Sequence, residues 1–293
     1  MTPPRLTLLA DRGVVCVAGA DAGKLLQGVI SNDVGVLDRA PALHAGLLSP
    51  QGKILFEFFL VRAGDAFLLE TRRELASELV KRLSMYRLRA KATIADASAD
   101  YRLLVAWGTS AGQVAPHGLV SYPDPRLADL GIRLLQRADA QETVPIDERS
   151  FATPGDWHRH RIGLGVPEGG KDYPLGDTFP HEADFDLLNG VSFSKGCFVG
   201  QEVVSRMHNR ASVRKRVVPI EADVPLTAGA AISAGKAVIG TIGSVAGRRG
   251  LAMLRLDRAA EARASGEALT ASGVVIHVRR PPWAAHQADW AAP

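Results

Sequence analysis

Near residue 210 the sequence changes from mixed helix and strand signals to strand signals alone. Beyond that point, short runs of β-branched and aliphatic residues alternate with turns rich in glycine and alanine. These runs are residues 216–220, 238–245, 251–256 and 274–279. Short strands at such regular spacing are typical of a small antiparallel barrel. We therefore expect a β-barrel module over residues 210–282, followed by a tail over residues 283–293.

The first 209 residues mix strand and helix patterns, which predicts an α+β region of mixed sheets. Residues 5–18 have the pattern of a strand hairpin that turns at residues 11–13. Further strands are expected at residues 43–48, 53–61, 66–70, 92–95, 101–107 and 132–136.

Apolar residues at helical spacing indicate helices between these strands. Asp21 is a plausible cap for one helix, and Thr71 for another that reaches about Ser84. A short helix is expected after Gly108, and residues 156–162 have a helical pattern. The apolar stripes that should face the core are Leu25, Leu26, Val29 and Ile30 in the first helix and Leu75, Leu79, Val80 and Leu83 in the second.

Composition excludes several classes of protein. Two distant cysteines without a CxxC pair argue against a disulfide scaffold and fit a reducing compartment. The N-terminus lacks the features of a secretory signal, and the longest apolar run, residues 54–61, is interrupted by Glu57. Since no run is long enough to cross a bilayer, we expect no membrane partner and a cytoplasmic protein.

The charge of the chain gives a weaker constraint. The net charge is only +4 and 6% of the residues are aromatic, whereas nucleic-acid binders usually carry a stronger charge and exposed aromatic side chains. Basic residues do cluster at residues 72–73, 87–91 and 206–216. We expect no nucleic-acid partner; these clusters suit solvated faces, an anionic ligand or an acidic partner protein.

The residues that carry the most chemistry surround Cys197. Lys195 lies two positions before it, Gly196 and Gly200 flank it, and an amphipathic helix is expected to begin at Gln201. A neighbouring cation and a helix N-terminus both favour the thiolate, which is the form that binds metals. Free cysteines are also among the most buried residues, so Cys197 can equally be a small core residue, as we expect for Cys16.

The other candidate metal ligands do not form a site in the sequence. His158 and His160 lie two positions apart on an expected helix, so they point to different sides. No second cysteine lies near Cys197, whereas an ordinary iron–sulfur cluster needs four thiolates. Any cluster at Cys197 must therefore take further ligands from a partner protein, glutathione or a second copy of the chain.

Residues 188–202 resemble the signature of the YgfZ family, which are folate-binding-type proteins related to the glycine-cleavage T-protein. Residues 180–182, Pro-His-Glu, make the chain more similar to the mitochondrial assembly-factor branch of that family. Further matching blocks are residues 21–28, 31–34, 48–55 and 161–169. The resemblance implies a three-lobed fold, with two ferredoxin-like lobes within residues 1–209 around a central channel and the C-terminal barrel as the third.

The resemblance also implies a role in the maturation of iron–sulfur proteins, supporting [4Fe–4S] enzymes. Cys197 would then be a ligand of a [2Fe–2S] or [4Fe–4S] cluster shared with an A-type carrier protein, and the chain alone would be mostly a monomer. The remaining residues of this thiol site would be Lys195, Gly196, Gly200, Gln201, Glu202 and Arg206.

Two other functions stay open. One is a tetrahydrofolate-dependent aminomethyltransferase, like the T-protein. There an acid pair falls on Phe56 and Glu57, and the pterin-holding glutamate falls on Gly163, so we expect weak folate binding and no transferase activity. The candidate folate residues are Asp33, Gln51, Glu57, Arg161 and Glu182. The other function is a non-catalytic scaffold or folate-binding regulator, in which Cys197 is structural.

Overall fold

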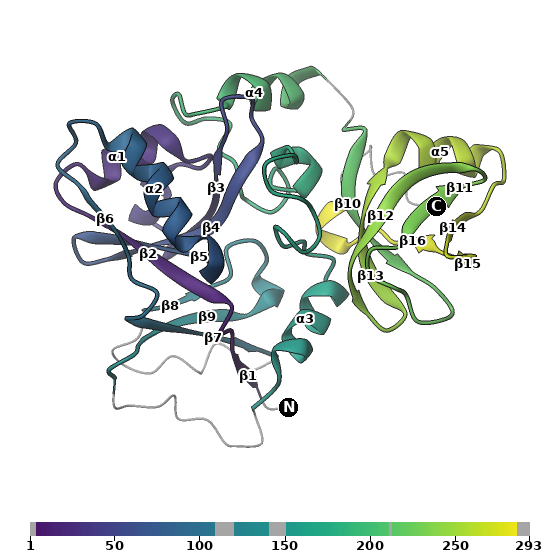
Figure 1. Ribbon diagram of the computed structural model, residues 1–293, viewed down its shortest axis with the longest axis horizontal. Coiled ribbons are helices and arrows are strands. Elements are labelled where there is room, and N and C mark those ends of the chain that lie inside the picture. The colour runs from purple at the N-terminus through teal and green to yellow at the C-terminus, as the bar shows by residue number, and fades with distance from the viewer. Residues whose placement is uncertain (1–3, 109–119, 141–150, 211–212, 286–293) are drawn as a thin grey trace. The chain divides into compact units, whose positions relative to one another are not determined.

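The computed structural model describes residues 4–108, 120–140, 151–210 and 213–285 (Figure 1). The chain forms two compact units. The first comprises Met1–Pro50, Leu55–Trp157 and Leu188–Gln201, and the second comprises Gln51–Ile54, His158–Leu187 and Glu202–Pro293. The prediction divides the chain at residue 210 into consecutive parts, whereas each of the two units is built from three separate segments of the chain.

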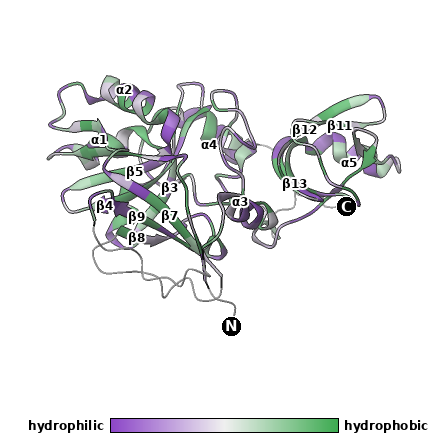
Figure 2. Ribbon diagram, turned by 60° about the horizontal axis from the view of Figure 1, so that its bottom comes forward, coloured by the Kyte–Doolittle hydropathy of each residue, from purple (hydrophilic) through white to green (hydrophobic). Residues whose placement is uncertain are grey.

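The first unit contains a five-stranded and a four-stranded antiparallel sheet. The five-stranded sheet has the order β3 (Ala42–Leu48), β4 (Ile54–Ala63), β5 (Ala66–Arg72), β2 (Arg12–Ala18) and β6 (Thr93–Asp96). The four-stranded sheet has the order β1 (Arg5–Leu8), β7 (Tyr101–Trp107), β9 (Ile132–Arg137) and β8 (Val120–Pro123). Figure 2 shows hydrophobic residues concentrated in strands such as β7.

Two helices, α1 (Ala22–Val29) and α2 (Ala76–Arg87), lie side by side against the five-stranded sheet (Figure 1). The predicted stripe of α1 is confirmed, because its four apolar residues belong to the main core. The predicted caps are not formed. The carboxylate of Asp21 accepts from the amide of Lys91, and the hydroxyl of Thr71, which lies in β5, donates to the carbonyl of Glu57.

The predicted hairpin over residues 5–18 is wrong. β1 pairs with β7, whereas β2 pairs with β5 and β6 in the other sheet. The two strands separate because their apolar residues face different cores: Leu6 packs with Ala106 and Leu134, and Val15 and Val17 belong to the main core together with buried residues of α1 and α2. The short helix expected after Gly108 lies outside the described residues.

The second unit contains the predicted antiparallel barrel. Its seven strands have the order β15 (Val274–Val275), β14 (Leu269–Ala271), β11 (Ala231–Ala234), β12 (Ala237–Ala246), β13 (Arg249–Arg255), β10 (Lys215–Glu221) and β16 (His277–Val278). Sequence patterns missed β11, β14 and the helix α5 (Leu256–Ala264). The helices α3 (Pro154–Gly163) and α4 (Gln201–Arg210) match the predictions at residues 156–162 and after Gly200.

Residues 282–284, where the predicted tail over residues 283–293 begins, form a short helical turn. The indole of Trp283 donates to the carbonyl of Leu164 at 2.8 Å, and Ala284 is fully buried. Among the described residues, no helix has the length and apolar character that a transmembrane span requires.

Candidate functional site

The loop before α4 presents Cys197 to solvent. The residues on both sides of its tip are buried: Lys195 is 7% exposed and Phe198 is 8% exposed. Gly196 and Cys197 are exposed between them. The loop is therefore anchored on both sides and projects the thiol, which does not fit a cysteine that fills the core.

Lys195 anchors the loop through its ammonium group. Its Nζ donates to the carbonyl oxygens of Gln27, Ile30 and Asn32 at 2.7, 2.8 and 2.8 Å. An ammonium has three N–H donors, and here each has an acceptor. Burial lowers the pKa of Lys195 to about 8, while Asp33 opposes the shift. The ammonium group predicted to activate the thiol therefore binds carbonyl oxygens at the end of α1.

The two glycines around Cys197 differ in what the backbone requires. Gly200 has a φ of 81°, in the left-handed region that favours glycine. Gly196 does not have a positive φ, and a Cβ added there would meet no atom within 4 Å. Gly200 is therefore required by the fold, whereas Gly196 leaves space beside the thiol.

The predicted partners on α4 are surface residues. Arg206 donates to Glu202 at 2.8 Å one turn away, and both side chains are exposed. Exposed pairs of this kind contribute about 0.3–0.5 kcal/mol, so they add little to the fold. The amide of Gln201 donates to the carbonyl of Phe198 at 3.2 Å, which closes the turn after Cys197.

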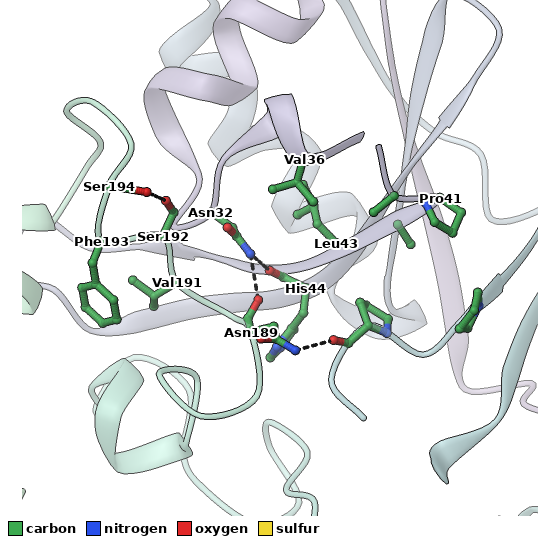
Figure 3. A pocket seen from close by; sticks show the side chains of 14 residues that line it. Asn32, Val36, Pro41, Leu43, His44, Asn189, Val191, Ser192, Phe193 and Ser194 are labelled. Carbon is green, nitrogen blue, oxygen red and sulfur yellow. Dashed lines mark hydrogen bonds between the residues drawn. The ribbon is translucent and has the colours of Figure 1, made fainter. Parts of the chain in front are cut away.

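A cavity of about 740 Å³ lies within the first unit, beside the segment that leads to Cys197. Asn32 connects its two sides, since its Nδ2 donates to the carbonyls of His44 and Asn189 at 2.8 and 2.7 Å (Figure 3). Its walls are mostly apolar: Val36, Pro41, Leu43, Pro123, Pro125, Val191 and Phe193. A cavity of this size and character suits a small organic ligand.

His44 in the cavity wall is almost fully buried. Its Nδ1 lies 2.9 Å from the carbonyl oxygen of Leu188, and its Nε2 lies 3.1 Å from Glu57 Oε1. A carbonyl oxygen only accepts, so Nδ1 donates to Leu188, and both ring nitrogens of His44 have a partner. The sequence signal that could have revealed His44 is a single ionisable residue inside the apolar run 43–48.

The neighbouring residues Phe56 and Glu57 face opposite sides of β4. Phe56 is buried in the main core, whereas Glu57 contacts His44 and lies 3.8 Å from Arg126. Alternation along a strand explains this division. The position at which the resemblance places the first transferase acid is therefore part of the hydrophobic core.

The five candidate folate residues are divided between the two units. Asp33 and Glu57 belong to the first unit, where their neighbours Asn32 and His44 line the cavity. Gln51, Arg161 and Glu182 belong to the second unit. Asp33 accepts from the amide of Gly35 and from Gln27, so it caps a short helical turn.

The three candidates in the second unit have other surroundings. Arg161 is buried and donates to the carbonyl of Val166, to Asp172 and to Ser244 at 2.6, 2.6 and 3.0 Å. Glu182 accepts from the amide of Phe179 at 2.9 Å, and Gln51 is an exposed turn residue. Arg161 and Glu182 therefore stabilise the fold in this structure.

Within the part of the chain that the structure describes, no group of three or more His, Cys, Asp or Glu side chains could hold a metal ion. Cys197 therefore offers a single sulfur ligand. The arrangement can supply one ligand to a metal centre whose other ligands come from elsewhere.

Comparisons with known proteins identify the family. Residues 214–286 match the family model described as the C-terminal β-barrel domain of CAF17. The mouse protein named iron–sulfur cluster assembly factor IBA57, mitochondrial, is 31% identical over 281 residues, which cover 85% of this chain and 77% of the mouse protein. The human protein of the same name is 32% identical over 276 residues, covering 84% and 76%.

The chain belongs to the IBA57 family of iron–sulfur cluster assembly factors. An IBA57 homolog from Mycosarcoma maydis is 34% identical over 230 residues, or 74% of this chain. The chain spans little more than half the length of the fungal relatives, covering 57% of this one and 53% of that from Neurospora crassa. All four relatives are named as mitochondrial, so the prediction of a cytoplasmic protein is wrong.

A solved structure confirms the predicted fold class. The glycine cleavage system aminomethyltransferase T from Bartonella henselae matches 96% of this chain and 86% of its own, with a TM-score of 0.77 and 16% identity. At that identity the likeness shows the fold alone. The T-protein-like α+β architecture with a C-terminal barrel therefore holds for this member of the IBA57 family.

Proposed function

We propose that this member of the IBA57 family supports the delivery of [4Fe–4S] clusters, with Cys197 as one ligand of a cluster shared with a partner. The observation that carries the proposal is the exposed thiol on a loop anchored by Lys195 and Phe198. Anchoring on both sides keeps the thiol at a fixed position, which reduces the conformational entropy lost when it binds iron.

The partner must contribute most of the ligands, because a cluster normally has four thiolates and this loop offers one. An A-type carrier protein suits this need better than glutathione or a second copy, since it brings both the cluster and several thiolates. When the thiol of Cys197 binds iron, an Fe–S bond forms to Cys197, the Fe–S bond to one thiolate of the carrier breaks, and that thiolate takes up the proton that Cys197 loses. The open space at Gly196 allows another molecule to approach the sulfur closely.

The test uses the full chain with a purified A-type carrier that holds a [2Fe–2S] cluster. Cys197→Ser keeps the size of the side chain but replaces a soft ligand with a poor one. We expect it to abolish the coloured, cluster-bridged complex while the melting temperature stays unchanged, because the side chain is exposed. Cys16→Ser is the matched control and should leave the complex intact.

The cellular test is deletion of the gene, followed by measurement of [4Fe–4S] enzymes such as aconitase. We expect their activities to fall, and complementation with the Cys197→Ser variant should not restore them. Unchanged activities in the deletion strain would contradict the proposed function.

A second candidate, a folate-linked role, is favoured by the cavity of about 740 Å³ in the first unit. The residues fit neither the pterin anchor nor the acid pair that the resemblance implies, because Gly163 has no side chain and Phe56 lies in the core. We therefore propose weak folate binding without aminomethyl transfer. Calorimetric titration with tetrahydrofolate tests this, and a sub-micromolar complex, or turnover in a glycine-cleavage assay, would contradict it.

A further inference from the structure

The end of α2 and the turn after it expose two large apolar side chains. Met85 is 68% exposed and Leu88 is 87% exposed. Leu88 also has a φ of 43° and a ψ of −108°, at a helix end where glycine is far more easily accommodated. A strained leucine that buries almost none of its surface does not stabilise the fold, which points to a role in contact with another molecule.

The same segment carries a concentrated positive charge. Residues 79–95 contain no acidic residue and five basic ones: Lys81, Arg82, Arg87, Arg89 and Lys91. Among the described residues, none of these five forms an ion pair. Other exposed arginines do pair, for example Arg255 with Asp257 and Arg258 with Glu261. Residues 81–91, which we name the α2 patch, therefore present five basic side chains without an ion-pair partner in the described part of the chain around an apolar tip, with the carboxylate of Asp21 at the edge beside residue 91.

The α2 patch and the thiol loop lie at the two ends of one short helix in the same unit. Lys91 is held at the start of α1, since its amide donates to Asp21 at 2.7 Å and its carbonyl accepts from the amide of Asp21 at 3.2 Å. Lys195 is bound to carbonyls at the end of α1, including that of Gln27. The eight residues of α1 span about 12 Å at 1.5 Å per residue.

We propose that the α2 patch docks an acidic face of the protein that shares a cluster at Cys197, with Leu88 entering an apolar pocket of that partner. The inference rests on the proposed function. A standard interface of about 800 Å² per partner is roughly 30 Å across, so one partner can cover both the patch and the thiol. Arginine guanidinium groups pair with carboxylates in a bidentate manner, which gives such a surface orientation as well as attraction. We favour a protein over an anionic membrane as the occupant of the patch, because a cluster at Cys197 requires a protein that supplies its other ligands.

The experiment measures the affinity of a purified A-type carrier for the full chain by calorimetry, without and with its cluster. We expect the double variant Arg87→Glu with Arg89→Glu to weaken binding at least tenfold and to reduce its salt dependence. The matched control is Lys236→Glu with Arg248→Glu, which reverses two exposed charges in the second unit and should change affinity less than twofold.

Leu88→Gly separates docking from stability. Because glycine suits the backbone at residue 88, the variant should melt at the same or a higher temperature than the natural chain and still bind the carrier at least fivefold more weakly. A stability loss with unchanged affinity would overturn the docking role. Leu88→Asp should weaken binding further, since it introduces a repelled charge.

The outcomes distinguish a failure of the docking surface from a failure of the proposed function. Unchanged affinity in the Arg87 and Arg89 double variant, with a coloured complex still formed, would overturn the docking surface and leave the proposed function standing. No carrier complex in any state would overturn both. Binding to vesicles of equal phosphatidylcholine and phosphatidylglycerol that is lost in the double variant, with carrier affinity unchanged, would overturn the docking surface in favour of a membrane.

Discussion

At the scale of single residues, the contacts of the side chains near Cys197 differ from the roles that their residue types predict. Lys195 lies two positions from Cys197, yet its three donors bind carbonyls of the α1 end. It therefore holds the loop in position beside the exposed Cys197. The side of Gly196 is open, so the thiol that we propose as a ligand is accessible while the residues that support it are buried.

Lys195→Met should lower the free energy of unfolding by at least about 3 kcal/mol, because three carbonyls would lose their donor, at about 1–3 kcal/mol for each. Urea denaturation measures this. Lys24→Met on the exposed face of α1 is the control and should change stability by less than about 0.5 kcal/mol. Unchanged stability together with slower alkylation of Cys197 would instead give Lys195 its predicted electrostatic role.

Asp184 gives the second unit a pH dependence. It is fully buried and shares Arg216 with Asp186, at 2.9 and 2.7 Å. Burial raises the pKa of Asp184 to about 8, against the attraction of Arg216 and with the help of Asp186. Since the unfolded carboxyl titrates near pH 4, the native state holds one more proton between about pH 4 and 8. Stability should therefore fall as the pH rises through that range, by up to about 1.4 kcal/mol per unit.

Asp184→Asn should remove this dependence, because an amide resembles the protonated carboxyl and does not titrate. Asparagine also accepts the left-handed backbone that Asp184 adopts, with its φ of 61°. Denaturation at pH 5, 6.5 and 8 should show the variant gaining on the natural chain as the pH rises. Parallel pH profiles for the two proteins would contradict the assignment.

At the scale of elements, one buried carboxylate connects the two sheets of the first unit. Glu70 in β5 accepts from Arg12 in β2 at 2.9 Å, from Arg133 in β9 at 2.8 Å and from Tyr122 in β8 at 2.5 Å. Burial opposes its ionisation, but Arg133 and Arg12 hold the pKa of Glu70 below its usual range. The strands of one sheet thereby neutralise charges carried by the other.

Glu70→Gln should cost about 3–5 kcal/mol, because the buried guanidinium of Arg12 would lose its counter-charge and that of Arg133 would keep only Asp124, while the shape of the side chain is kept. Glu74→Gln breaks an exposed pair with Arg72 and should cost less than about 1 kcal/mol. Equal stabilities of the two variants, measured by urea denaturation, would show that the ion pairs do not hold the sheets together.

At the scale of the whole molecule, the barrel depends on a segment that precedes it by many residues. Arg216 in β10 is buried against Asp184, and the amide of Ser244 in β12 donates to Asp172 at 2.8 Å. Both acceptors lie in the segment His158–Leu187 of the same unit. The barrel family model matches residues 214–286 alone, whereas the compact unit in the structure also includes earlier segments of the chain.

Residues 213–285 expressed alone should melt at least about 10 °C below the unit in the full chain. The reason is that a loss of about 3 kcal/mol in the free energy of unfolding lowers the melting temperature of a small domain by that amount or more. Arg216→Met should stabilise this fragment, in which the guanidinium has no partner, and destabilise the full chain, in which it does. Calorimetric scans of the four proteins give the comparison, and the same sign of effect in both backgrounds would contradict it.

Local sequence patterns predict the positions of most strands, the core face of α1, the barrel, and one cysteine on a turn before a helix. These depend on neighbours within a few residues, so periodicity and turn residues reveal them. Contacts between distant segments determine that β1 and β2 separate, that Cys197 is exposed and that Lys195 is an anchor. The bond from Lys195 to Gln27 joins residues 168 positions apart, and those from Glu70 to Arg133 join residues 63 apart. Such pairings are selected by the burial of groups that must find a partner away from water, and local sequence does not record where that partner lies.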